Sequence, residues 1–282
     1  MGIRLIAVDV DGTLLNSKKE LTEPVAQAIR AVRDCGYLFT IATGRDIRGL
    51  RSFRHLLSPE APVITYNGAE ILRAGSGERI SAAYLREESA LEIIQTGISL
   101  GFSVIVWSNG VLYIGKPGIY SRGYSEMYGI RELELSNPEV LAHQGVTKVI
   151  WAGETGRIRE LEKEYRISPI RGSECCTSDA SYLEFMAEGV NKGAGLRMAA
   201  EALGLSSQEV MAVGDGHNDL PMLRWAGLSV AMGNASPEVK AASDFITESC
   251  DRDGLAAALN HLILKYAPVS DPASRPGESS MN

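Results

Sequence analysis

Two carboxylates follow the first apolar run of this 282-residue chain. Asp9 and Asp11 come directly after Leu5–Val8, and Gly12 then opens a turn. If the strand expected here extends through Asp11, its two-residue period points both side chains the same way. Such carboxylates repel each other unless a cation lies between them or one holds a proton. The pair therefore favours an enzyme with a hard divalent ion such as Mg²⁺, a nucleophilic carboxylate and an acid–base group, although Asp-Gly also marks ordinary turns.

A second acidic group follows the buried run 210–213. It is the segment Gly214–Asp219, in which Asp215, Asn218 and Asp219 lie within five residues. Two carboxylates and an amide are costly to bury together without a cation. Oxygen ligands without cysteine favour Mg²⁺ over zinc, and the twelve-residue acidic pattern of a calcium loop is absent.

Three further polar positions lie at predicted element ends. Thr43 and Gly44 follow the buried run 37–42, where a hydroxyl and backbone N–H groups can bind a phosphoryl oxygen, although the same residues occur in plain turns. Arg45 either reaches the same anion or caps the following helix. Lys192 precedes a helical pattern, where a cation is unfavourable unless an anion such as a phosphate or Asp9 is close.

A fourth polar position is more ambiguous. Asn67 and Gly68 follow the predicted strand 62–66, and this dipeptide is the strongest signal for a hairpin. On local grounds Asn67 is therefore a turn residue.

Four segments, taken in order, resemble the motifs of the haloacid dehalogenase (HAD) superfamily of phosphotransferases. They are residues 9–14, 41–45, 189–193 and 214–219. Tyr66–Ala69 makes the chain most similar to the Cof-type branch, which comprises phosphatases of sugar phosphates and cofactors. The resemblance implies a Rossmann-like parallel-sheet core (HAD-like) with an inserted α+β cap domain.

The resemblance also implies roles for individual residues. The catalytic residues would be Asp9 as nucleophile, Asp11 as general acid and base, and Lys192. The substrate phosphate would be held by Thr43, Gly44, Lys192 and Asn218. The Mg²⁺ ligands would be Asp9, Asp11 and Asp215. Supporting positions around them would be Asp219, Asn67 and Arg45.

The elements that must position these residues fall into two groups. At both ends of the chain, buried apolar runs alternate with helical patterns, which is typical of right-handed parallel α/β units. From about residue 83 the sequence pattern changes and indicates an antiparallel sheet with helices. The predicted strands are 102–107, 111–114, 146–151 and 182–185, and the predicted helices are 87–100 and 156–165. We expect a core of residues 1–82 and 187–266, a cap of residues 83–186 and a disordered tail at 267–282.

Composition narrows the class of protein. The net charge of −7 argues against a nucleic-acid groove or an anionic membrane surface as partner. We find no signal peptide and no apolar run long enough to cross a bilayer. The four cysteines lack zinc-ligand spacing, so we expect free thiols and a cytoplasmic location.

The predicted function is phosphoric monoester hydrolysis, in which Mg²⁺ assists the attack of Asp9 on a small phosphorylated metabolite, a sugar phosphate or phosphorylated cofactor. The resemblance also disfavours dehalogenation, because the dehalogenating members of the family lack an acid at the position of Asp11. The alternatives are a phosphosugar mutase of the same superfamily, a phospho-acceptor signalling module, which the large insertion disfavours, and a non-catalytic binding protein. The sequence identifies neither the substrate nor the oligomeric state.

Overall fold

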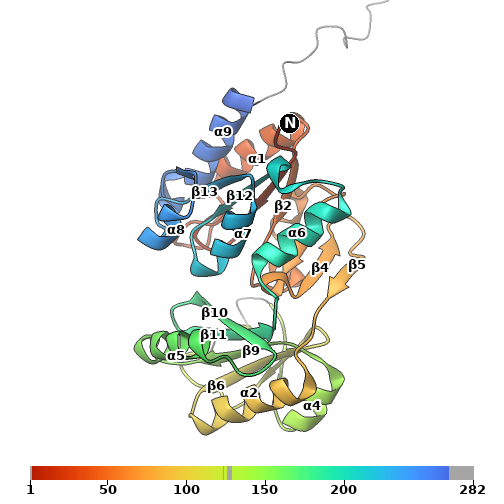
Figure 1. Ribbon diagram of the computed structural model, residues 1–282, viewed down its shortest axis with the longest axis vertical. Coiled ribbons are helices and arrows are strands. Elements are labelled where there is room, and N and C mark those ends of the chain that lie inside the picture. The colour runs from red at the N-terminus through yellow and green to blue at the C-terminus, as the bar shows by residue number, and fades with distance from the viewer. Residues whose placement is uncertain (1, 123, 126–128, 267–282) are drawn as a thin grey trace, which may run out of the picture.

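The core is a parallel β-sheet covered by helices on both faces (Figure 1). The computed structural model describes residues 2–122, 124–125 and 129–266. The strand order is β14-β13-β12-β1-β2. The strands are β1 (Leu5–Val8), β2 (Leu38–Ile41), β12 (Val210–Gly214), β13 (Leu228–Ala231) and β14 (Phe245–Ile246). The tail predicted to be disordered, 267–282, lies outside the described residues.

Strand β1 is an inner strand of this sheet, between β12 and β2, and its side chains are buried on both faces. Its alternate side chains separate into two apolar clusters, as a period of two requires. Ile6 and Val8 pack with helices α1 (Glu23–Asp34) and α9 (Gly254–Tyr266). Leu5 and Ala7 pack on the opposite face with helices α6, α7 and α8. These three helices are α6 (Lys192–Ala202), α7 (Leu220–Trp225) and α8 (Pro237–Ala241).

The connections around β1 create a crevice at its carboxyl end. The chain passes from β1 to β2 on one side, whereas β12, which pairs with the other side, comes about two hundred residues later along the chain. In open parallel sheets, ligands bind at such a switch point.

A hairpin extends the core beside β2. Strands β3 (Pro62–Thr65) and β4 (Glu70–Arg73) pair antiparallel, and β5 (Arg79–Ala82) pairs with β4. A parallel bridge between Ala42 and Ile64 joins the hairpin to the end of β2. The hairpin predicted at Asn67-Gly68 is confirmed, with Asn67 in the left-handed conformation at φ 57°.

The inserted region forms a second sheet, which we call the cap (Figure 1). Its strand order is β10-β11-β9-β6-β7-β8. The strands are β6 (Ser103–Ser108), β7 (Val111–Ile114), β8 (Glu132–Glu134), β9 (Val146–Ala152), β10 (Ser173–Asp179) and β11 (Tyr182–Ala187). Helices α2 (Glu87–Ser99), α4 (Pro138–Gln144) and α5 (Thr155–Ile167) pack on one face of this sheet. The other face contacts the core at Tyr66 and Ala69.

The predicted fold class, a parallel core with a separate α+β region, is confirmed. Within the cap, the expectation of a wholly antiparallel sheet is wrong, because β7 and β8 are parallel. Strands β8 and β10 were not predicted, since β8 is fully exposed and β10 is mostly polar and half-buried, so neither has an apolar alternation. The boundaries of 83 and 186 for the cap stay a prediction.

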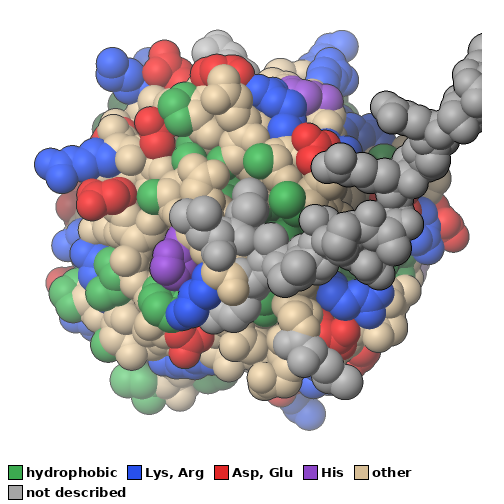
Figure 2. All heavy atoms as spheres, turned by 90° about the horizontal axis from the view of Figure 1, so that it is seen from above, with side chains coloured by type: hydrophobic (Ala, Val, Ile, Leu, Met, Phe, Trp, Pro, Cys, Tyr) green, Lys and Arg blue, Asp and Glu red, His purple; other side chains and the backbone are tan. Residues whose placement is uncertain are grey.

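The exposed face at the α9 end of the molecule carries acidic and basic side chains side by side (Figure 2). Apart from the atoms drawn in grey, this face carries no cluster of side chains of the same charge. Among the helices of the described residues, none has both the length and the apolar character needed to span a membrane.

Candidate active site

The predicted site residues lie where three strands of the core end. Asp9 directly follows β1, Asp215 follows β12, and Thr43 comes two residues after β2. The backbone N–H of Asp9 donates to Val213 O at 3.0 Å, which aligns the ends of β1 and β12. Because parallel strands share their carboxyl edge, residues more than two hundred positions apart meet there.

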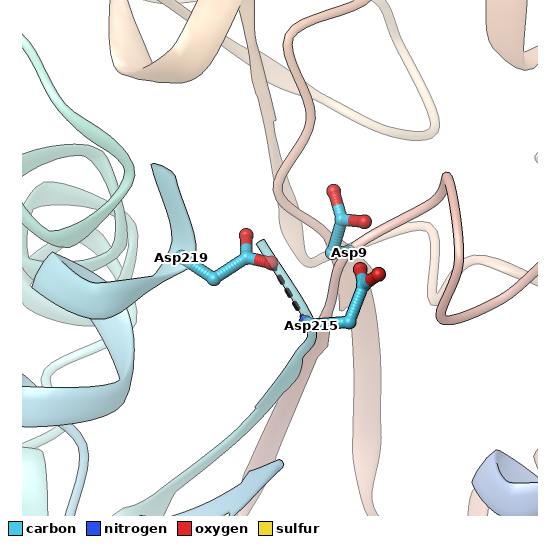
Figure 3. Close-up of side chains that lie close together, drawn as sticks. All are labelled: Asp9, Asp215 and Asp219. Atoms are coloured by element: carbon cyan, nitrogen blue, oxygen red, sulfur yellow. Dashed lines mark hydrogen bonds between the residues drawn. The ribbon is translucent and has the colours of Figure 1, made fainter. Parts of the chain in front are cut away.

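Three carboxylates converge at this edge (Figure 3). One oxygen each of Asp9, Asp215 and Asp219 lies within 4.8 Å of the others. Lys192 at the start of α6 completes the group, with its Nζ 2.5 Å from Asp9 Oδ1 and 2.6 Å from Asp219 Oδ1. Lys192 and Asp219 are fully buried. A buried cation at a helix N-terminus is thus offset by two carboxylates, as the sequence suggested for one of them.

The three carboxylates are differently engaged. Asp219 Oδ2 accepts from the backbone N–H groups of Asp215 and Gly216, both at 2.9 Å, so both of its oxygens are bound within the chain. Asp215 accepts from Thr13 Oγ1 and from Asn234 Nδ2. Asp219, held by the ion pair with Lys192 and by two backbone N–H groups, positions Lys192, whereas Asp9 and Asp215 are less fully engaged and are the candidate ligands for a hard cation. This all-oxygen donor set suits Mg²⁺.

Crowding of carboxylates changes their protonation. Burial, and then the charge of Asp219, raise the pKa of Asp9 well above its usual range, although Lys192 opposes the shift. Burial and the same neighbour raise the pKa of Asp215 to about 7. A divalent cation would relieve this repulsion, so the electrostatics of the site fit a bound metal ion.

Asp11 has different partners from those of Asp9. Strand β1 ends at Val8, and the chain then coils so that Leu14 N–H donates to Asp9 O. The expectation of a strand through Asp11 is therefore wrong. The carboxylate of Asp11 instead contacts Arg45.

Two cations hold the Asp11 carboxylate. Arg45 donates from Nε at 2.8 Å and from Nη2 at 2.6 Å, and Lys19 Nζ lies at 2.8 Å. Burial alone would raise the pKa of Asp11, but these hydrogen bonds and charges lower it to about 2. Arg45 thus fixes Asp11, a role that the sequence did not indicate. Lys19 was missed, because it lies in a polar loop without a motif.

The turn of Thr43 and Gly44 borders a small cavity of about 130 Å³ that also contains Asp9, Asp11 and Asp215. Thr43 is buried, and its Oγ1 accepts from the backbone N–H of Arg45 at 3.2 Å. The cap supplies the opposite wall of this cavity through Ser178, Asp179, Tyr182 and Glu184. A larger cavity of about 750 Å³ lies on the other side of Asn218 and Lys192 but includes none of the three acids.

Asn218 and Asn67 link the loop that carries Asp215 and Asp219 to the core hairpin. Asn218 Nδ2 donates to Asn67 Oδ1 at 3.2 Å. Asn67 Nδ2 donates in turn to Glu184 of the cap at 2.6 Å. The turn residue Asn67 therefore also connects the core to the cap. Glu184 and its partner Lys148 were missed, although each is a charged residue within an otherwise apolar strand sequence, which is the signal that could have found them.

Comparison with known proteins gives consistent matches over almost the whole chain. The profile of the family described as haloacid dehalogenase-like hydrolase matches residues 6–259. An HMP-PP phosphatase of Cronobacter sakazakii is 30% identical, over 94% of this chain and 99% of its own length. A 5-amino-6-(5-phospho-D-ribitylamino)uracil phosphatase of Bacillus subtilis is 29% identical, over 93% of this chain and 96% of its own.

Solved structures agree with these matches. A haloacid dehalogenase-like hydrolase from Bacteroides thetaiotaomicron has a TM-score of 0.80 at 28% identity, covering 92% of this chain and 99% of its own. A sugar phosphatase of HAD subclass IIB has a TM-score of 0.79 at 26% identity, with coverages of 92% and 98%. The likeness extends over both the core and the cap.

Proposed function

This chain belongs to the haloacid dehalogenase-like hydrolases, and from that premise we propose that it is a Mg²⁺-dependent phosphatase of small phosphate monoesters. The observation that carries the proposal is the contact of Lys192 with Asp9 at the switch point of the core sheet, beside Asp215 and the Thr43 turn. The relatives named above act on different phosphorylated compounds. The proposal is therefore limited to a small phosphorylated metabolite, such as a sugar phosphate or a phosphorylated cofactor.

In the proposed first step, a carboxylate oxygen of Asp9 attacks phosphorus, and the bond from phosphorus to the ester oxygen breaks. Asp11 gives a proton to the leaving oxygen, which departs as an alcohol. Since Arg45 and Lys19 hold Asp11 ionised in this arrangement, Asp11 must exchange these contacts for the leaving oxygen and take up a proton before this step.

In the second step, the Asp11 carboxylate removes a proton from water, and the water oxygen attacks phosphorus. The bond between phosphorus and Asp9 breaks, which releases phosphate and restores Asp9. Lys192 carries a positive charge because its pKa is raised by Asp219 and Asp9 despite burial, so it can stabilise the phosphoryl oxygens throughout.

The remaining polar residues would hold the substrate phosphate and the ion. Thr43, Gly44 and Asn218 border the cavity and would bind phosphoryl oxygens. Asp9 and Asp215 would hold Mg²⁺, with Asp11 close by on the same loop. The ion, when bound, neutralises charge on the phosphate and on the carboxylates.

A cytoplasmic location is part of the proposal. The four cysteines are free thiols, which suits a reducing compartment.

The decisive experiment is phosphate release from a panel of phosphorylated sugars and cofactors, with Mg²⁺ or with EDTA. Asp9→Asn is the control variant. Release that needs both Mg²⁺ and Asp9 supports the proposal. If sugar phosphates isomerise without net release, the protein is a mutase instead.

A further inference from the structure

Lys148 and Glu184 form a buried ion pair on neighbouring strands of the cap. Lys148 lies on β9 and Glu184 on β11, with exposed side-chain fractions of 1% and 3%. Lys148 Nζ is 3.2 Å from Glu184 Oε1. A buried ion pair rarely adds net stability, because desolvating two charges costs about as much as their attraction returns. Stability alone therefore does not explain why this pair is buried in the cap.

Both members of the pair reach out of the cap into the core. Lys148 Nζ donates to the carbonyl oxygen of Gly44 at 2.7 Å. Glu184 Oε2 accepts from Asn67 Nδ2 at 2.6 Å. Within the cap, Ser178 Oγ donates to Glu184 Oε1 at 2.7 Å. The pair thus contacts two turns of the core at once, one after β2 and one after β3.

These two turns are already joined to each other. The backbone N–H of Asn67 donates to Thr43 O at 2.8 Å, and the N–H of Tyr66 donates to Arg45 O at 3.1 Å. The packing at Gly44 is close, since a Cβ there would lie 3.1 Å from Asn67 Oδ1 and in contact with Glu184 Oε2 at 3.4 Å. The two turns and the pair form one tightly packed unit.

The unit extends into the reaction site. Asn67 Oδ1 accepts from Asn218 Nδ2, and Asn218 lies in the same loop as Asp215 and Asp219. The pair is therefore connected to the Thr43–Gly44 turn through the Gly44 carbonyl, and to the loop of Asp215 and Asp219 through Asn67 and Asn218.

We infer that Lys148 and Glu184 are positioning residues: the pair holds the Thr43–Gly44 turn and the Asn67–Asn218 contact in place when the cap lies against the core. The pair makes cap closure a condition for an ordered phosphate site. The inference rests on the proposed function for its kinetic part only, because the order of the two turns can be measured without turnover.

The test uses Lys148→Met, Glu184→Gln and the double variant. Lys148→Met leaves Glu184 buried without its cation, so we expect lower stability than in the wild type. The double variant removes both charges, so we expect stability to recover. It leaves the Gly44 carbonyl without its donor, so kcat should stay low by about 10²-fold, the cost of a small misplacement, with a lesser change in KM.

Arg157→Met is the matched control. Arg157 Nη2 also donates to a backbone carbonyl oxygen, that of Leu100 at 2.8 Å, but both residues lie in the cap and neither borders the site cavity. We expect this variant to keep the kcat of the wild type.

Hydrogen–deuterium exchange supplies the readout that is independent of activity. In Lys148→Met and in the double variant, the amides of Thr43 and Asn67 should exchange faster, whereas Arg157→Met should leave them protected. Unchanged exchange, or recovery of kcat together with stability in the double variant, would overturn the inference. If the wild type releases no phosphate from any ester, the proposed function fails, and the exchange data alone decide on the positioning role.

Discussion

The ammonium group of Lys192 lies 2.5 Å from the Asp9 carboxylate, inside a protein core where neither residue has much access to solvent. Asp219 holds the same ammonium group from the other side. Asp9, which we propose as the nucleophile, its cation Lys192 and Asp219, which orients the cation, therefore come from three separate motifs, and each depends on the others for charge balance.

Lys192→Met should destabilise the protein by about 3–5 kcal/mol, because it leaves two buried carboxylates without a cation. The loss should shrink at lower pH, since protonation removes the uncompensated charge. Urea unfolding at about pH 5 and about pH 8 measures the difference. The double variant Lys192→Met/Asp219→Asn should regain part of the stability but none of the phosphatase activity; a double variant as unstable as the single one contradicts this account.

Asp11→Asn should lower steady-state phosphate release by about 10²–10⁴-fold, the usual contribution of general acid–base catalysis. A substrate with a good leaving group, such as p-nitrophenyl phosphate, does not need the proton in the first step. We therefore expect one rapid turnover and a phosphoryl group trapped on Asp9, detected by mass spectrometry of the quenched protein. Steady turnover at the rate of the wild type would exclude Asp11 as the acid and base.

Mg²⁺ binding should release protons at about pH 6 and release fewer at about pH 9. The pKa of Asp215 is raised from 3.8 to about 7, so the metal-free protein holds a proton that the ion must displace. Calorimetry in buffers of different ionisation enthalpy counts the protons. Equal proton release at both pH values is the contrary result.

The same shift has a consequence for stability. A carboxyl group with a raised pKa favours the folded state at low pH, and this contribution is lost as the pH rises from about 4 to about 7. The protein in EDTA should therefore lose stability over this range, and Mg²⁺ should offset the loss by binding the folded form. Thermal unfolding with EDTA and with Mg²⁺ at several pH values tests this; a loss that Mg²⁺ leaves unchanged contradicts it.

Gly12→Ala should weaken Mg²⁺ binding. Gly12 has φ +87°, and a Cβ there would collide with the carboxylate of Asp215. Gly36 is a matched control, because its φ is +88° but nothing lies within 4 Å of its added Cβ. Both alanine variants should lose about 1–2 kcal/mol from the left-handed backbone, and only Gly12→Ala should lose Mg²⁺ affinity in a calorimetric titration. Equal affinities in the two variants would mean that the collision is relieved without moving Asp215.

The residues at strand ends were predictable because parallel sheets bring those ends together whatever the length of the connections. The positions of Asp9, Thr43 and Asp215 followed from buried runs that end in a polar residue, whereas their roles were predicted only through the family resemblance. The partners of Asp11 were not predictable in this way. They depend on where β1 ends and on the coil that brings Arg45 to Asp11, and both are set by long-range packing.

The cap also contains features that depend on long-range packing and could not be predicted from the local sequence. Strand β9 is apolar and was predicted, whereas β10 is polar and forms because its partner β11 offers hydrogen bonds. The Lys148–Glu184 contact joins two strands across 36 positions of sequence. The only sign of it in the sequence is that each residue is charged and lies within an apolar strand.

The place of the cap in the chain has a consequence for synthesis. Strand β1 is made first, but β12, its neighbour on one side, is made only after the whole cap sheet. We expect proteolysis of ribosome-bound chains that stop at about residue 200 to leave a resistant cap and a digested core. The reason is that β1 can pair with β12 only after β12 has been made, and this pairing must close a loop that contains the whole cap. A protected core would contradict this expectation. The cap would thus be the first part of the protein to become ordered on the ribosome, and Asp9 would be among the last residues to meet its partners.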